Sequence, residues 1–222
     1  MSLLRRPPGP GLDAHAARRQ RMVDRFVAAR GVSDARVLAR LGALPRHLFV
    51  DEALAAEAYG DHSLPIGHGQ TISQPYIVGL MSELLALEPA HRVLEIGTGC
   101  GYQTAVLAGL SQHVYSIERL RALLERAQRN LRLARVLNVS LRLSDGSLGW
   151  PDRGPFDRIL VTAAARRVPA ELVAQLKPSG RLVLPMLAPQ GQRLCLVRRE
   201  AGGVVEQDHG PCSFVPLVGR AG

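Results

Sequence analysis

The chain has a mass of 24.0 kDa and 222 residues, of which 46% are hydrophobic and 21% are charged, and it is predicted to form one soluble globular domain. No apolar run approaches the roughly 20 residues that span a bilayer. The formal net charge is +9, but 27 of the 28 basic residues are arginine and only 4% of the residues are aromatic, which indicates a compositional bias and is weak evidence for nucleic-acid binding. Cys100, Cys195 and Cys212 have no C-x-x-C spacing and the N-terminus has no secretory h-region, so we expect no disulfide framework, no metal site and a cytoplasmic location.

The N-terminal part is predicted to be a helical cap. Residues 1–12 contain three prolines and two glycines and are expected to be a flexible tail, followed by one domain over 13–222. We divide this domain into a helical cap with a substrate loop, 13–75, and a cofactor-binding core with C-terminal strands, 76–222. Within the cap, helical patterns are predicted over 13–29, from an N-cap at Ser33-Asp34 through Leu41, and around 53–58.

The segment Leu-Pro-Ile-Gly-His-Gly-Gln-Thr-Ile-Ser-Gln-Pro, residues 64–75, is predicted to be an unusual loop. It precedes an amphipathic helix predicted over 76–87. Ser73 could be the N-cap of this helix, with Pro75 in its first turn. Alternatively, the loop and the start of the helix form a wall of a ligand site. The two interpretations are compatible with each other.

A glycine-rich turn is the strongest signal in the chain. The apolar run 92–96 predicts a buried parallel strand, and Gly-Thr-Gly-Cys-Gly follows at 97–101, before a helix expected over 101–110. Such glycines permit positive φ and close approach of a ligand, although they could also form only a tight turn. Tyr102 stands where the dinucleotide pattern has its third glycine. Glu95 would disfavour a pyrophosphate and favour a cationic cofactor such as S-adenosylmethionine.

Acidic residues follow the next two predicted strands, 113–117 and 139–143, at Glu118 and at Asp145-Gly146. Glu118 lies 23 residues after Glu95, close to the ~20-residue offset of an acid that binds ribose hydroxyls, although it could instead be a first-turn helix acid. Asp145 could accept a hydrogen bond from an adenine amino group, or the Asp-Gly pair could be merely a turn. Together with Glu95, these acids are expected to converge on one rim.

The remaining pattern completes a doubly wound, Rossmann-like α/β fold with a mostly parallel sheet. A strongly periodic helix is predicted from Leu120 to Ala134. The later elements are expected to be a strand over 156–162, a helix over 168–176, a strand over 181–187, a hairpin of 192–199 and 204–207, and a last strand over 213–218.

These residues resemble the bacterial protein-L-isoaspartate (D-aspartate) O-methyltransferases, over roughly Arg30 to Val218. The segments that carry the resemblance are 64–75, Val-Leu-Glu-Ile-Gly-Thr-Gly-Cys-Gly-Tyr at 93–102, Phe156-Asp157 through Val161-Thr-Ala-Ala164, and Phe-Val-Pro-Leu-Val at 214–218. The resemblance implies a class I fold that transfers a methyl group from S-adenosylmethionine, leaving S-adenosylhomocysteine, to the free α-carboxylate of L-isoaspartyl residues in damaged proteins and peptides. Repair then proceeds through a succinimide.

The resemblance also implies roles for single residues. Ser73 would be the active-site serine beside the methyl-accepting carboxylate, and Thr71, Ile72 and Val215 would bind the substrate peptide. Cys100 departs from the family, in which serine is common at this position, with little expected consequence. The protein would be a monomer without a metal. The implied cofactor-binding residues are Glu95, Gly97, Thr98, Gly99, Gly101, Glu118, Asp145 and Gly146.

The predicted chemistry needs few groups. A carboxylic acid with a pKa of about 3.9 is already ionised at neutral pH, so no general base is required. A nucleic-acid methyltransferase of the same fold is the alternative enzyme, but Thr162-Ala163-Ala164-Ala165 stands where enzymes that methylate exocyclic amines often place Asn/Asp-Pro-Pro-aromatic. A cofactor-fold module that only binds RNA or a protein is the non-enzymatic alternative, and the intact glycine loop with its acids argues against it.

Overall fold

The computed structural model describes residues 14–220, so the predicted tail over 1–12 lies outside the described residues. The central sheet is formed by seven strands within this range. The strands are β3 (Arg92–Ile96), β4 (His113–Glu118), β5 (Val139–Leu143), β6 (Phe156–Val161), β7 (Leu176–Ala188), β8 (Gly191–Glu200) and β9 (Gly203–Cys212).

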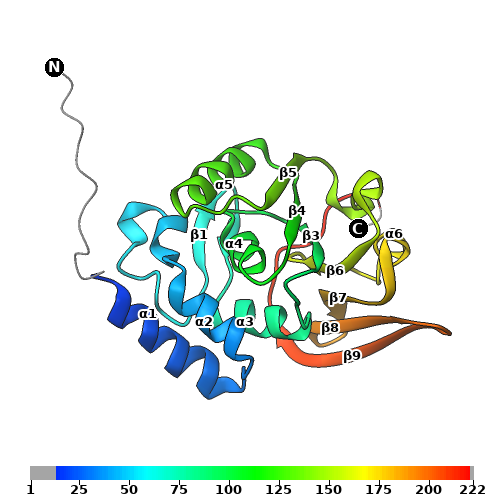
Figure 1. Ribbon diagram of the computed structural model, residues 1–222, viewed down its shortest axis with the longest axis horizontal. Helices are drawn as coiled ribbons and strands as arrows, with labels where there is room; N and C mark the ends of the chain where they lie inside the picture. The colour runs from blue at the N-terminus through cyan, green and yellow to red at the C-terminus, as the bar shows by residue number, and fades with distance from the viewer. Residues whose placement is uncertain (1–13, 221–222) are drawn as a thin grey trace.

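The strand order is β5-β4-β3-β6-β7-β8-β9 (Figure 1). The strands from β5 to β7 are parallel, whereas β8 and β9 are antiparallel additions. Strand β3 lies in the middle, where Leu94 pairs with Tyr115 on one side and with Ile159 on the other. Because β3 is covered on both faces, its residues from Val93 to Ile96 are all buried, which explains the continuous apolar run. The predicted doubly wound α/β fold is confirmed.

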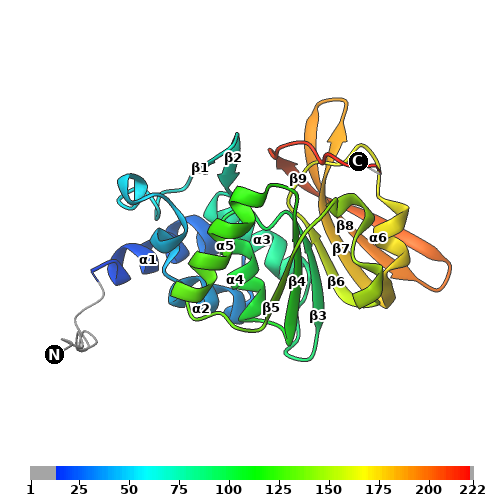
Figure 2. The same ribbon diagram turned by 90° about the horizontal axis from the view of Figure 1, so that it is seen from above.

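Helices cover both faces of this sheet (Figure 2). One face carries α3 (Pro75–Leu84), α4 (Tyr102–Ala108) and α5 (Arg121–Leu133), and the other carries the short α6 (Ala170–Ala174). On α5 the predicted stripe packs inward, with Leu123, Ala127 and Leu131 at most 2% exposed. Burying each such leucine contributes about 1.5–3 kcal/mol, so packing rather than intrinsic propensity holds this helix in place.

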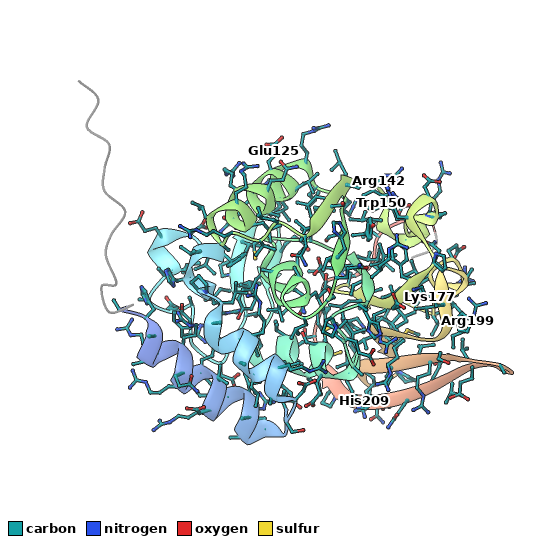
Figure 3. The ribbon with its side chains drawn as sticks, viewed as in Figure 1. Glu125, Arg142, Trp150, Lys177, Arg199 and His209 are labelled. Carbon is teal, nitrogen blue, oxygen red and sulfur yellow. The ribbon has the colours of Figure 1, made fainter. Side chains whose placement is uncertain are left out.

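The second face is closed by aromatic side chains and two 3₁₀ turns, η5 (Gly146–Leu148) and η6 (Pro151–Arg153). Trp150 packs edge-on against Tyr115, with ring centroids 5.8 Å apart. The Arg142 guanidinium lies 5.2 Å from the centre of the Trp150 ring, and Figure 3 shows the two side chains next to each other. These contacts cover the outer part of the sheet that α6 does not reach.

The N-terminal cap packs beside the α3–α4–α5 face (Figure 1). Asp34 is the N-cap of α2 and accepts hydrogen bonds from the N–H groups of Arg36 (2.8 Å) and Val37 (3.4 Å), as the Ser33-Asp34 pattern predicts. The expected helix over 53–58 is only a 3₁₀ turn followed by turns. The cap elements are α1 (Ala16–Met22), the π-turn η1 (Val23–Val27), η2 (Ala28–Arg30), α2 (Ala35–Ala43), η3 (Arg46–Phe49) and η4 (Glu52–Leu54).

The predicted loop over 64–75 contains a small hairpin separate from the main sheet. Strands β1 (Leu64–Gly67) and β2 (Gln70–Ile72) pair antiparallel. Residues Gly67, His68 and Gly69 all have positive φ at the turn. Glycines at two of these positions make the tight turn possible, because L side chains rarely adopt this conformation.

Three other expectations are corrected. The segment 213–218 is not a strand, because its main-chain partners are a single bridge between Ala164 and Pro216 and the Gln192 side chain. The expected helix over 168–176 is limited to α6, and β7 begins earlier than expected, because Leu176 already pairs with Phe156.

No helix among residues 14–220 is long and apolar enough to cross a membrane.

Candidate active site

A cavity of about 650 Å³ opens at the carboxyl ends of β3, β4 and β6. The chain order reverses at β3, whose neighbours in the sheet are β4 and β6, and open α/β sheets bind ligands at such switch points. The cavity is walled by the glycine loop, by the β1–β2 hairpin with the start of α3, and by the C-terminal segment. Predicted site residues that line it are Thr71, Ile72, Ser73, Gly97, Thr98, Gly99, Glu118, Gly146 and Val215.

The glycine loop has the backbone that its sequence predicts. Gly97, Gly99 and Gly101 have φ values of 96°, 55° and 89°. A Cβ at Gly97 would collide with the Thr162 hydroxyl, which donates to the main-chain oxygens of Ile96 or Gly97. Gly97 and Gly99 therefore form a glycine cradle, in which a ligand can approach the backbone closely.

Gly101 has a different role from the predicted one. It does not line the cavity but is the N-cap of α4, and a Cβ there would lie 3.2 Å from Leu131 Cγ. This glycine allows α4 and α5 to pack closely, and only the first two glycines of the loop face the cavity.

Glu118 is 5% exposed and lies at the cavity wall, as predicted. Its Oε2 accepts a hydrogen bond from Gly99 N–H at 2.9 Å, and its Oε1 accepts from Arg119 N–H at 2.9 Å and Leu120 N–H at 3.0 Å. These three donors fix the carboxylate against the glycine loop. A carboxylate has about four acceptor positions, so capacity remains for a ligand hydroxyl.

Glu95 lies beneath the glycine loop and not on the rim where it was expected. It is fully buried, and its Oε2 accepts hydrogen bonds from Thr104 (2.5 Å) and Ser116 (2.6 Å). Ser116 also bonds Thr98, which does line the cavity, at 2.6 Å. Burial raises the pKa of Glu95 to about 8, so the group is mostly neutral at pH 7 and cannot select a cationic ligand by its charge.

Asp145 is also turned away from the cavity. Its Oδ1 accepts hydrogen bonds from the N–H and hydroxyl of Ser147, at 2.9 and 2.8 Å, and its Oδ2 accepts from Arg220 N–H at 2.9 Å. The carboxylate therefore holds a turn and the C-terminal segment, and Gly146 forms the wall instead. The convergence of three acids on one rim is wrong, because only Glu118 reaches the cavity.

The segment that contains Ser73 forms the opposite wall. Helix α3 has Gln74 as its N-cap residue and Pro75 at its first position, so the hypothesis that Ser73 caps this helix is wrong. Within residues 14–220 the Ser73 hydroxyl has no hydrogen-bond partner, and it is available to a ligand. The Ser73 carbonyl accepts a hydrogen bond from the Arg46 guanidinium at 2.8 Å.

Val215 lies in a segment that Gln192 holds. Gln192 accepts a hydrogen bond from Phe214 N–H at 2.7 Å and donates to the Phe214 carbonyl at 2.9 Å, so one side chain takes the place of a neighbouring strand. The Val215 carbonyl accepts from Ala164 N–H at 2.8 Å. Gln192 is not among the predicted site residues, because no local sequence pattern indicates a contact across 22 residues.

Residues of the cap and of α3 complete the cavity. Arg30 pairs with Asp61 at 3.2 Å, and its guanidinium lies 3.8 Å from the centre of the Tyr76 ring. All three line the cavity, and none was predicted. Within residues 14–220 no group of three or more His, Cys, Asp or Glu side chains is placed to hold a metal ion.

Comparisons with known proteins find relatives of one family over most of the chain. The sequence model of the protein-L-isoaspartate (D-aspartate) O-methyltransferase family matches residues 17–222. A protein-L-isoaspartate O-methyltransferase of Trichlorobacter lovleyi is 52% identical over 205 residues, which cover 92% of this chain and 94% of the relative. One of Methylorubrum extorquens is 55% identical over 208 residues, covering 93% and 91%.

Solved structures give the same result for the fold. A protein-L-isoaspartate O-methyltransferase structure matches with a TM-score of 0.83 and 30% identity over 92% of this chain and 67% of the other. A Plasmodium falciparum homologue crystallised with S-adenosyl-L-homocysteine matches with a TM-score of 0.79 and 24% identity, over 90% and 98% of the two chains. The second likeness concerns the fold alone.

Proposed function

The chain belongs to the protein-L-isoaspartate (D-aspartate) O-methyltransferase family, and we propose that it methylates the free α-carboxylate of L-isoaspartyl residues in damaged proteins and peptides. The structural observation that supports this function is one cavity that brings the Ser73 segment face to face with the glycine loop. The neighbouring main-chain nitrogen attacks the methyl ester and expels methanol, which closes a succinimide. Water reopens this ring partly to normal aspartate, so repeated turnover repairs the chain.

S-adenosylmethionine supplies an activated methyl group when it is bound. We assign Gly97, Thr98, Gly99 and Gly146 to the surface that holds this cofactor, and Glu118 to its ribose hydroxyls. The glycine cradle and the remaining acceptor capacity of Glu118 support this fit.

The protein's contribution to the reaction is position and the removal of water. The substrate carboxylate is ionised at neutral pH, so the free Ser73 hydroxyl donates a hydrogen bond that orients one carboxylate oxygen. Thr71, Ile72 and Val215 hold the peptide on either side. Such positioning lowers the reaction barrier by about 7–11 kcal/mol when the geometry is good. Because the substrate carboxylate is already ionised, the cavity needs no acid–base pair in addition.

We also propose a single catalytic domain over 13–222 that acts as a cytoplasmic monomer. Its three cysteines are free thiols, which suits a reducing compartment. Light scattering on the purified protein tests the monomer, since a mass of twice 24.0 kDa would contradict it.

The decisive experiment uses labelled S-adenosylmethionine and two peptides that differ only in an aspartyl or isoaspartyl linkage. The expected result is a base-labile methyl ester on the isoaspartyl peptide alone. If neither peptide is methylated while S-adenosylhomocysteine still binds, the proposed substrate is wrong. Methylation of RNA or DNA in the same assay would favour the nucleic-acid alternative.

A further inference from the structure

Arg46 is a fully buried arginine behind the cavity wall. Its Nε donates to the Ala58 carbonyl at 2.7 Å and its Nη2 donates to the Ser73 carbonyl at 2.8 Å. No carboxylate among residues 14–220 lies within ion-pair distance of it. A guanidinium stays protonated in proteins, and burying one without a counter-charge costs several kcal/mol. Main-chain carbonyls and an aromatic ring are the groups that offset this cost.

Two of the partners of Arg46, Ser73 and Tyr102, belong to the two walls that must meet during the reaction. Ser73 belongs to the substrate wall. The guanidinium carbon also lies 4.8 Å from the ring centre of Tyr102, the cavity-lining residue that follows the glycine loop. Tyr102 is itself buried and packs edge-on against Phe49, which stands three residues after Arg46 in η3. One side chain thus links the backbone of the candidate catalytic serine to the start of α4.

We propose that Arg46 is a positioning residue that fixes the Ser73 backbone at a set distance from the glycine loop. The inference rests on the proposed function. In-line methyl transfer requires the substrate oxygen and the methyl carbon to approach at about 3–3.5 Å, and a misplacement of about 1 Å costs on the order of 100-fold in rate. Arg46 touches neither ligand, so its effect passes through Ser73.

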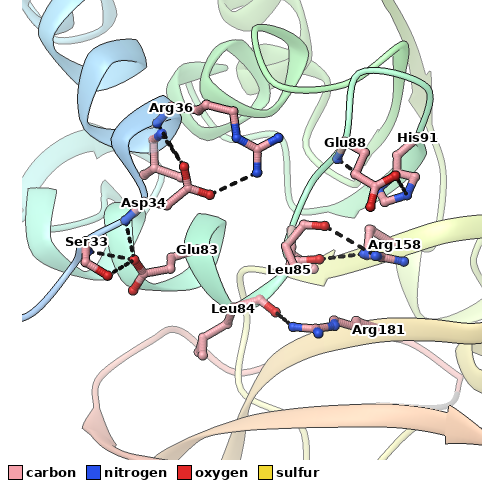
Figure 4. A network of polar contacts seen from close by, with 12 residues as sticks. Ser33, Asp34, Arg36, Glu83, Leu84, Leu85, Glu88, His91, Arg158 and Arg181 are labelled. Carbon is pink, nitrogen blue, oxygen red and sulfur yellow. Dashed lines mark hydrogen bonds and ion pairs between the residues drawn. The ribbon is translucent and has the colours of Figure 1, made fainter.

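Helix α3, which begins just after Ser73, offers a matched control at its C-terminal end (Figure 4). Arg158 donates to the Leu85 carbonyl at 2.5 Å and to the Ala86 carbonyl at 3.2 Å, just after α3. Like Arg46, it is an arginine that holds main-chain oxygens beside α3. It lies outside the cavity lining, so its replacement perturbs the anchoring of the helix without disturbing Ser73.

The experiment compares Arg46→Lys, Arg46→Met and Arg158→Lys in the full chain. Lysine keeps the charge and a donor but cannot reach two carbonyls in the planar geometry of arginine. For Arg46→Lys we expect kcat on the isoaspartyl peptide to fall about 10- to 100-fold, and further for Arg46→Met. The Kd for S-adenosylhomocysteine should stay within about twofold of wild type in both variants, and Arg158→Lys should keep the wild-type kcat.

Three outcomes would overturn the inference. Wild-type kcat in Arg46→Met would show that the guanidinium is dispensable. A parallel loss of S-adenosylhomocysteine binding, including loss through misfolding, would show that Arg46 supports the whole fold rather than Ser73. An equal fall in kcat for Arg158→Lys would show a general effect of anchoring α3. Failure of the wild-type protein to methylate the isoaspartyl peptide would instead refute the proposed function.

Discussion

The Ser73 hydroxyl lies at the cavity wall and has no hydrogen-bond partner within residues 14–220, so it is available to a substrate carboxylate. Hydrogen bonds to charged groups contribute about 1.5–3 kcal/mol, so Ser73→Ala should lower kcat/KM for the isoaspartyl peptide roughly 10- to 100-fold. The change should leave stability and S-adenosylhomocysteine affinity nearly unchanged, because Ser73 does not cap α3. Steady-state kinetics, calorimetry and thermal unfolding measure these three quantities.

Ser140 is the matched control for this serine. Ser140 lies on the edge strand β5, outside the cavity lining, and its hydroxyl is hydrogen-bonded to the His113 ring at 2.9 Å. Ser140→Ala should therefore keep wild-type kinetics. If Ser73→Ala weakened cofactor binding and catalysis equally, Ser73 would have a structural role and the orienting hydrogen bond would be refuted.

Glu95, which lies beneath the glycine loop, makes the stability of the fold depend on pH. Burial raises its pKa from an ordinary 4.5 to about 8 in the folded protein. Between these two values the folded state binds more protons than the unfolded state, so stability falls as pH rises. The contribution of the protonated group is complete below 4.5 and is lost as pH passes about 8.

Glu95→Gln tests this linkage because glutamine is a neutral side chain of the same shape. Relative to the variant, the wild-type free energy of unfolding should decline by up to about 1.4 kcal/mol per pH unit across this window. Urea unfolding of both proteins at about pH 5, 6.5 and 8 measures the difference. Parallel stability curves would mean that Glu95 is already ionised at pH 5 in the folded state.

At the scale of elements, strands buried on both faces were the easiest to predict. The apolar run 92–96 predicts β3 with the observed bounds, because a strand covered by helices on both faces must be apolar throughout. The edge strand β5 also has the predicted bounds, although none of its residues is fully buried. The segment 213–218 is also mainly apolar, yet it is not a strand. Its partners are the Gln192 side chain and one bridge, and such long-range contacts leave no local pattern.

In the candidate site, too, features set by local sequence were predicted and features set by long-range contacts were not. The Ser73 segment and the first two glycines of the loop carry motifs with a local backbone requirement, and they line the cavity as predicted. Glu95 and Asp145 were placed on the rim because their strands end there. The direction of each side chain depends on hydroxyl and N–H donors elsewhere in the fold, which strand position alone does not predict.

Gly97 is the loop glycine at which an added Cβ would make the shortest contact, with Thr162 Oγ1. Its positive φ strains any other residue, and a Cβ would collide with Thr162 Oγ1. Gly97→Ala should therefore weaken S-adenosylhomocysteine binding by at least about tenfold, because backbone strain of about 1–3 kcal/mol is combined with a displaced loop. Calorimetry measures this loss. Gly202→Ala is the control, because a Cβ at this position in the β8–β9 turn would meet no atom within 4 Å, and it should bind S-adenosylhomocysteine normally. Normal binding by Gly97→Ala would refute the role of the glycine cradle.

At the scale of the whole molecule, the net charge of +9 acts on the substrate before any contact forms. At the cavity itself Arg30 and Arg119 are balanced by Asp61 and Glu118, so the excess positive charge lies elsewhere on the molecule and acts on a peptide from a distance. Charge of one sign around a site raises the local concentration and the association rate of oppositely charged ligands. A repair enzyme with this surface should therefore favour isoaspartyl sites with acidic neighbours.

Two isoaspartyl peptides test this preference, one with glutamates and one with lysines beside the damaged residue. At low ionic strength we expect kcat/KM to be about tenfold higher for the acidic peptide, with similar kcat values, because steering acts on encounter and not on methyl transfer. The difference should shrink with added salt, since the Debye length falls from about 10 Å at 0.1 M to about 3 Å at 1 M. A preference that persists at 1 M salt would instead indicate direct contacts in the cavity, and the Arg30–Asp61 pair would be the first to replace.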